Sequence, residues 1–343
     1  MENKYFASSN SYDGFYSLFG NIFNSKSFDN VFVLKGGPGT GKSTLMKNIA
    51  EFSEKHGGSN TLYYCSSDTD SIDGVIINIE NKKIAIIDGT APHERDAIYV
   101  GATDEIINLG ESIDSEWIKK HRDSIISLSS QKSSAYKTAY SYLKVAGECY
   151  KEIYENKVAT FDKASALKYI SSLEINEFLI DGITEKRFSS AFGKNGYKNF
   201  SLSDKECGNA IKICGDYTNS KILLKFIISK FDGNKMQLLL SPLSPELAET
   251  VIIGEDILFV SSEEGTISSD DFFTTSGINK EEIRLMTTIH DELLREATRW
   301  FSIASETHFK LEEIYGECMN FENNQNILSK ICKKIIKVCE CDN

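Results

Sequence analysis

The sequence lacks several features that define particular protein classes. Residues 1–6 have neither the basic nor the apolar region of a signal peptide, and no apolar run approaches the length of a membrane span. The net charge is −12, which argues against tight nonspecific binding to a nucleic-acid backbone without excluding a local basic patch. We therefore expect a cytoplasmic protein with no membrane contact.

The chain also lacks a paired cysteine pattern. Its eight cysteines are scattered, as in a reducing compartment. Cys332, Cys339 and Cys341 cluster, but no fourth ligand stands at zinc spacing, so reduced thiols are the expectation and metal binding the alternative. A chain of 343 residues with ordinary hydrophobic content exceeds what one core usually supports, which predicts two domains.

What the sequence does contain is a phosphate-binding loop between a strand and a helix. Residues 31–35 read as a buried strand, and apolar side chains recur at helical spacing over residues 43–52. The pattern G-x-x-x-x-G-K-S lies between them, and its glycines let backbone N–H groups surround an anion at the positive end of a helix. The residues expected to bind a nucleoside triphosphate are Gly36, Gly37, Pro38, Gly39, Thr40, Gly41, Lys42, Ser43 and Thr44.

One further residue completes the predicted site. Lys42 is expected to reach the β- and γ-phosphates, and Ser43 to ligate Mg²⁺. The apolar run 84–87 ends at Asp88, which is the form of a Walker B strand whose carboxylate holds the metal. Lys42 and Asp88 are thus the predicted catalytic residues, and Ser43 and Asp88 the predicted metal ligands. Gly89 stands where a hydrolytic glutamate usually follows. The nearest groups for positioning a water are His93, Glu94 and Arg95.

A helical arm is predicted after this region. Apolar residues are spaced four, three, four and three apart, as in a coiled-coil seam, with residues 117–131 as an antiparallel partner and residues 157–176 as a helical connection. The seam residues are Ala139, Leu143, Ala146, Tyr150 and Ile153.

The second half of the chain repeats the first in outline. Residues 188–197 echo residues 6–15, and residues 210–224 echo the strand, loop and helix, with Gly215 and Lys221 retained. Ser220 replaces a loop glycine, Ile222 replaces the Mg²⁺ serine, and Ser261 replaces Asp88. The aspartates at 68, 70 and 73 have no evident counterparts. Because Ile222 cannot ligate Mg²⁺, this half is expected to keep the framework without catalysis. The seam returns as Leu293, Ala297, Trp300, Ala304, Thr307, Leu311 and Ile314.

These motifs carry a resemblance. F-A-S-S-N, G-G-P-G-T-G-K-S-T, C-S-S-D-x-D-S-I-D-G-V and I-I-D-G-T-A-P-H, followed by a helical arm and repeated in outline, resemble an uncharacterised bacterial family of tandem P-loop ATPase-like proteins. The resemblance spans nearly the whole chain and implies nucleotide binding and hydrolase activity. The expected fold is α/β, with two tandem P-loop NTPase-like domains of mainly parallel sheets, each followed by a helical hairpin arm. The expected divisions are an active domain over 1–162, a linker over 163–185 and a degenerate domain over 186–343.

Three functions stay open on the sequence. The leading one is a Mg²⁺-dependent ATPase whose second half is regulatory or structural; the others are a kinase for a small molecule and an adaptor that binds a protein partner through its helical arms. No N-K-x-D motif is present, which favours ATP over GTP. Packing of the halves about a pseudo-twofold axis, with the seams as the docking surface, would bring a cation to the phosphates. The candidate cations are Lys221, Arg187, Arg284, Arg295 and Arg299.

Overall fold

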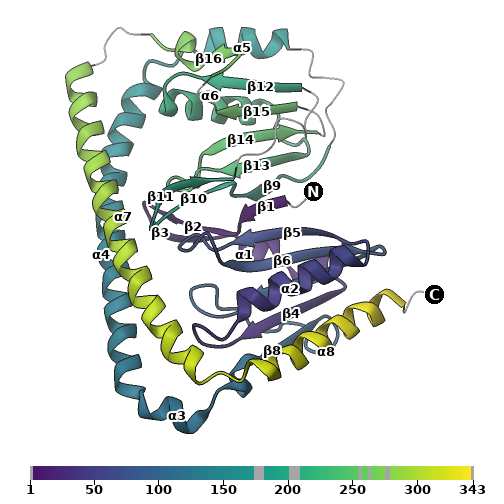
Figure 1. The fold of residues 1–343 in the computed structure, drawn as a ribbon. Coiled ribbons are helices and arrows are strands. Elements are labelled where there is room, and N and C mark those ends of the chain that lie inside the picture. The colour runs from purple at the N-terminus through teal and green to yellow at the C-terminus, as the bar shows by residue number, and fades with distance from the viewer. Residues whose placement is uncertain are drawn as a thin grey trace.

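The computed structural model describes residues 3–173, 181–200, 209–254, 257–261, 264–274 and 279–340. In this part of the chain, two six-stranded sheets lie beside a pair of long helices (Figure 1). The fold is α/β, and each sheet is mixed, with both parallel and antiparallel neighbours. Residues 174–180 of the expected linker lie outside the described residues.

The first sheet is organised around the predicted loop strand. Its order is β1 (Asn3–Phe6), β5 (Ser59–Tyr64), β6 (Ile72–Ile79), β7 (Lys82–Asp88), β4 (Asn30–Lys35) and β8 (Asp104–Asn108). Strand β4 runs parallel to both of its neighbours. Its side chains alternate between two core clusters, with Phe32 and Leu34 packed beneath helix α2 (Lys42–Lys55) and Val31 and Val33 on the opposite face. Burial on both faces explains why this strand reads as a continuous apolar run.

The second sheet has the same plan. Its order is β9 (Glu185–Arg187), β13 (Met236–Leu240), β14 (Ala248–Ile253), β15 (Ile257–Ser261), β12 (Asn209–Cys214) and β16 (Ile267–Ser268). Each of its pairs has the same direction as the corresponding pair in the first sheet. Helix α6 (Tyr217–Lys230) follows β12 as α2 follows β4. The apolar framework inferred from the sequence repeat is therefore present in the topology.

The two halves meet at equivalent residues. Phe6 and Phe188 hold the same place in the repeat, and their backbones exchange hydrogen bonds as an antiparallel bridge. A contact in which one residue meets its own counterpart is what a pseudo-twofold axis produces. A small hairpin follows on each side of this contact: β2 (Ser8–Ser11) with β3 (Gly14–Ser17), and β10 (Ser190–Gly193) with β11 (Gly196–Asn199).

The long helices also belong to both halves. Helix α4 (Arg122–Val158) and helix α7 (Lys280–Glu317) run antiparallel side by side (Figure 1). The predicted seams pack against each other, with Ala139 and Leu143 in one cluster with Ala297 and Phe301. The expected hairpin within each half is corrected: residues 122–131 continue the same helix as the seam. The antiparallel partner of α4 is α7, because the repeat supplies a second seam.

After this helix pair, each half has a helix that packs against the other half. Helix α5 (Lys163–Ser172) packs through Ala166 and Ile170 into the core of the second sheet. Helix α8 (Phe321–Glu340) packs through Ile331 and Ile335 against α2 and the first sheet. The crossings are tied by two backbone bridges: Ile113 with Met319, and Phe161 with Phe273.

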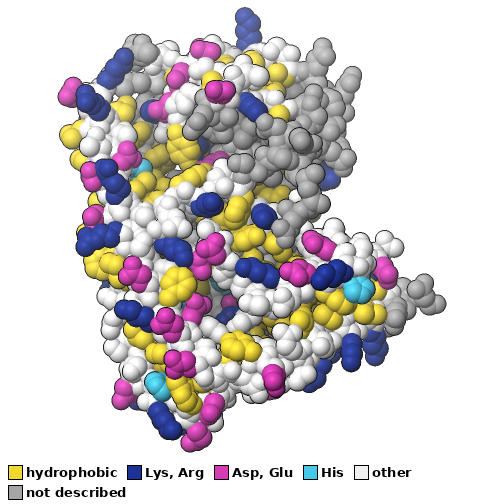
Figure 2. Space-filling model, viewed as in Figure 1, with side chains coloured by type: hydrophobic (Ala, Val, Ile, Leu, Met, Phe, Trp, Pro, Cys, Tyr) yellow, Lys and Arg dark blue, Asp and Glu magenta, His cyan; other side chains and the backbone are white. Residues whose placement is uncertain are grey.

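Short elements complete the chain: α1 (Phe19–Ile22), α3 (Ser115–Lys120), and the 3₁₀ turns η1 (Ser25–Ser27), η2 (Leu109–Ser112) and η5 (Ser269–Phe272). Over the described residues, no helix combines the length and apolar character needed to cross a bilayer. Along the outer edge formed by the long helices, basic and acidic side chains are interspersed, and the described part of this face shows no continuous basic stretch (Figure 2).

Candidate functional site

The loop between β4 and α2 is held open by its glycines. Gly39 and Gly41 have φ of 66° and 84°, a left-handed conformation that glycine adopts without strain. Gly41 is the N-cap of α2, and no side chain caps the helix there. The first N–H groups of α2 are therefore left without a side-chain acceptor, at the end of the helix that favours an anion.

Lys42 and Asp88 meet beside this loop. The Lys42 Nζ donates to the carbonyl oxygens of Gly36 and Gly37 at 2.8 Å each and lies 3.7 Å from the Asp88 Oδ2. Asp88 ends β7 and pairs with Leu34 of β4, so adjacent parallel strands deliver both groups to one edge. Their side chains are only 11% and 15% exposed. The structure thus brings together the two residues that the sequence assigns to catalysis.

The oxygen groups at this edge fit a magnesium ion. One Asp88 oxygen accepts hydrogen bonds from the Thr90 N–H and hydroxyl, while the other faces Lys42 beyond hydrogen-bonding distance. Burial raises the pKa of Asp88, and the Lys42 charge opposes that rise. The Ser43 hydroxyl accepts a hydrogen bond from the Ile72 N–H at 3.0 Å, which leaves its second lone pair for a metal ion. One hydroxyl and one carboxylate are the usual protein share of a Mg²⁺ site completed by phosphates and water.

The corresponding segment of the second half is wound into helix. Lys42 begins α2, whereas Lys221 lies in the second turn of α6. Residues 217–220 contain no glycine or proline, so nothing prevents them from adopting helical angles. The Asp216 carboxylate caps α6 by accepting from the N–H groups of Thr218 and Asn219. A side-chain carboxylate therefore stands where the first loop leaves the helix N-terminus open.

Lys221 is buried rather than presented to a ligand. It is 1% exposed, donates to the Ser241 hydroxyl at 2.6 Å and lies 3.8 Å from both Glu249 and the centre of the Tyr217 ring. Burial lowers its pKa from 10.5 to about 8, although the Glu249 charge opposes this. The register shows that Glu249 is the counterpart of Asp73, because Gly74 and Thr250 occupy matching positions. The expectation that Asp73 has no counterpart is thus wrong.

The first loop is covered by helices from the far end of the chain, which the sequence pattern did not indicate. A Cβ on Gly39 would lie 2.5 Å from the backbone oxygen of Glu312, and one on Gly37 would lie 2.9 Å from the Tyr315 ring. Burial raises the pKa of the Glu312 carboxyl, and the Gly39 N–H opposes that rise. On α8, the buried Asn324 donates to the Thr40 carbonyl at 2.9 Å.

The acidic turn after β5 makes two different contacts. Asp68 pairs with Lys194 of the second half at 2.8 Å. Asp73 is buried with its Oδ2 3.0 Å from the His93 Nε2, and its charge contributes to the raised pKa of Asp88. Asp70 contributes its backbone oxygen, which accepts from Lys47. The turn therefore contributes to the surroundings of the loop and to the contact between the halves.

The three residues considered for positioning a water, His93, Glu94 and Arg95, do not contact the loop in the described part of the structure. His93 stacks on Phe19 with ring centres 4.2 Å apart. Glu94 is exposed. Arg95 donates to the Phe23 carbonyl and to the Ser25 hydroxyl. None of these contacts involves Lys42 or the loop.

The candidate cations of the second half have other partners. Arg187 pairs with Glu185 and lies over Tyr5, while Arg284 lines a pocket with Asn219 of α6. Arg295 and Arg299 pair with acids one turn away on α7. Burial lowers the pKa of His308 on α7, and the charges of Lys132, Lys42 and Lys194 lower it further.

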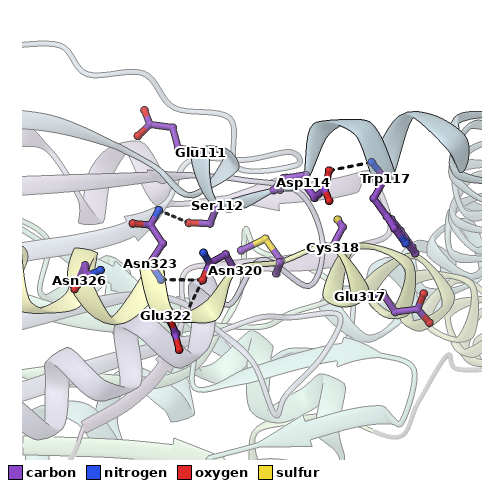
Figure 3. Close-up of a pocket in the computed structure, with 12 residues that line it drawn as sticks. Glu111, Ser112, Asp114, Trp117, Glu317, Cys318, Asn320, Glu322, Asn323 and Asn326 are labelled. Carbon is purple, nitrogen blue, oxygen red and sulfur yellow. Dashed lines mark hydrogen bonds between the residues drawn. The ribbon is translucent and has the colours of Figure 1, made fainter.

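A separate cavity of about 600 Å³ lies where the two arms cross (Figure 3). Asn323 donates to the Ser112 hydroxyl across it at 2.8 Å. Its lining includes four acidic side chains and, among the described residues, no basic one, which does not suit a phosphate group. The acidic side chains are Glu111, Asp114, Glu317 and Glu322.

Comparison with known proteins gives one partial match. A family model described as Nephrocystin 3, N-terminal, matches residues 17–136, a stretch that includes the loop and Asp88. No curated protein matches the chain. No solved structure matches it either.

Proposed function

We propose that the protein binds ATP with Mg²⁺ at residues 36–44 and hydrolyses it. The observation that carries the proposal is the conformation of the loop, with Gly39 and Gly41 left-handed, an uncapped helix N-terminus, and Lys42 placed between the loop and Asp88. Backbone N–H groups in this arrangement suit phosphate oxygens. A solvated turn would not need a buried lysine held by two loop carbonyls.

Each residue has a role in this proposal. Lys42 exchanges its loop carbonyls for the β- and γ-phosphates. Ser43 and Asp88 hold the metal, which would neutralise charge on the transferring phosphate. The α8 residue Asn324 fixes the Thr40 carbonyl and so keeps the loop in shape. The second half is proposed to be a degenerate P-loop domain, related by duplication and belonging to the tandem ATPase-like family that the motifs resemble.

Kinase activity is the second candidate. The residue after Asp88 is Gly89, and His93 and Arg95 are engaged by Phe19 and Asp73 and by Phe23 and Ser25. Gly89 supplies no side chain to orient a water, which suits transfer to an acceptor hydroxyl. The adaptor function has no comparable support, because the predicted arm seams are occupied by each other.

Turnover of the purified full chain with Mg-ATP separates these functions. Hydrolysis predicts phosphate release without an acceptor, lost on chelation of Mg²⁺ and in Lys42→Ala but kept in the matched variant Lys221→Ala. A phosphorylated product that forms only when a small-molecule acceptor is added would favour the kinase. Nucleotide binding that survives in Lys42→Ala would refute both.

A further inference from the structure

A turn of the second half packs against the acidic turn that follows β5 in the first half. The β10–β11 turn packs so closely that a Cβ on Gly193 would lie 2.7 Å from the Ser66 carbonyl oxygen, a separation that requires glycine. The Ser302 hydroxyl of α7 donates to the Lys194 carbonyl at 2.9 Å. The backbone that carries Lys194 is therefore fixed from both sides.

The Lys194 side chain is directed into the first half. Its ammonium lies 2.8 Å from the Asp68 carboxylate and 4.9 Å from the centre of the Phe309 ring, and the side chain is 16% exposed. Phe309 lies one turn before Glu312 on α7, and the Glu312 backbone is the part of that helix that packs against Gly39 of the loop. The Lys194 ammonium is thus held on the segment of α7 that covers the loop of the other half.

We propose that Lys194 contacts the terminal phosphate of the nucleotide bound at residues 36–44 and supplies, across the interface, the cation that stabilises charge in phosphoryl transfer. This inference rests on the proposed function. It replaces the arginines considered from the sequence, because three of them pair with acids elsewhere and Arg284 lines a pocket beside Asn219 of the second half. Asp68 holds Lys194 until the phosphate competes for it.

The asymmetry of the repeat supports this assignment. Tyr12 holds the place of Lys194 in the first hairpin, and its hydroxyl bonds to His290 of α7 at 2.7 Å. The first hairpin therefore presents an uncharged side chain at this position, and the cation that meets Asp216 at the second site is Lys157 of α4. Of the two hairpins, the one whose turn contacts Asp68 of the first half carries the cation.

The chemical step needs no further reactant. Attack of water on the γ-phosphorus forms one P–O bond and breaks the bond to the β,γ-bridging oxygen. ADP and inorganic phosphate result, and one proton of the water is released to solvent. Lys194 donates hydrogen bonds to the γ-phosphate oxygens and stays protonated throughout, so it offsets negative charge without exchanging a proton.

The test compares Lys194→Gln with Lys198→Gln, which removes an exposed lysine from the adjacent strand β11. Turnover, ADP affinity and affinity for ADP with aluminium fluoride are measured on the full chain. We expect Lys194→Gln to lower turnover and aluminium-fluoride complex affinity by at least about 100-fold, with ADP affinity within about threefold, since a cation supplied across an interface acts on the transferring group. Lys198→Gln should match the wild type.

Wild-type turnover in Lys194→Gln overturns the proposal, and so does an equal loss of ADP affinity, because the role would then be structural. If that variant does not fold, Asp68→Asn decides: freed from its partner, Lys194 should tighten ATP relative to ADP, and an unchanged ratio overturns the inference. Failure of Lys42→Ala to abolish binding would refute the proposed function itself, whereas a Lys42-dependent activity indifferent to Lys194 would refute only this inference.

Discussion

If nucleotide binds only the first loop, it should stabilise the fold through Lys42 and not through Lys221. A ligand at one hundred times its Kd adds about 2.7 kcal/mol to the free energy of unfolding. With an unfolding entropy of about 2.1 cal/mol/K per residue, this raises Tm by about 4 °C if the whole chain unfolds as one unit and by about 8 °C if only half does. We expect the smaller value, because α5 and α8 each pack into the opposite half.

The assay is thermal unfolding with and without Mg-ATP, and the quantity compared is the ligand-induced shift. The absolute Tm is unsuitable, because Lys42→Ala removes two hydrogen bonds to loop carbonyls and lowers stability by about 1–3 kcal/mol even without ligand. Lys42→Ala should abolish the shift. Lys221→Ala, which disturbs a buried lysine in the capped second site, should retain it. A shift that survives in Lys42→Ala, or one lost only in Lys221→Ala, would show that the wrong half was assigned.

Three further outcomes follow from the site. Asp88→Asn should lower turnover by about 100-fold or more while ATP affinity stays within about tenfold, since the metal's charge stabilisation is worth several kcal/mol; equal turnover would remove Asp88 from the mechanism. Glu312→Gln should tighten ATP by about tenfold, or about 1.4 kcal/mol, because it removes a negative charge beside Gly39 that would repel the phosphates. Titration calorimetry showing no change would contradict this. Burial and the charge of Lys132 lower the pKa of His308 from 6.5 to about 4, so the unfolded chain binds the proton first and the free energy of unfolding falls as pH drops from 6.5 toward 4. His308→Gln should flatten that fall when stability is measured by denaturant titration at several pH values. An identical dependence of stability on pH in the variant would refute this.

Much of the first site was predictable from local sequence. The strand–loop–helix order, the glycines and Lys42 form a contiguous segment whose conformation depends on nearby residues, and β7 ends at Asp88 because an apolar run gives way to a charged residue. The repeat was readable for the same reason, since strands buried on both faces keep apolar residues at matching intervals. The replacement of Ser43 and Asp88 in the second half was also visible as Ile222 and Ser261.

Other features depended on contacts between distant segments. The sequence predicted that the partner of the α4 seam is the segment just before it, whereas the structure pairs α4 with α7. The apolar pattern alone could not separate the two, because either partner would cover the same seam. Glu249 was missed as the counterpart of Asp73 because only strand register aligns the two.

The sequence by itself determined the loop, its lysine and the aspartate, because each depends on the chain within a few residues of itself. Only the tertiary structure decided which groups cover that loop. Glu312 and Lys194 lie far from it in sequence and have no local signature. A lysine in a hairpin turn gives the same sequence pattern whether its side chain faces solvent or a neighbouring half of the chain. Their placement follows from the pseudo-twofold packing that brings α7 and the β10–β11 turn onto the first half.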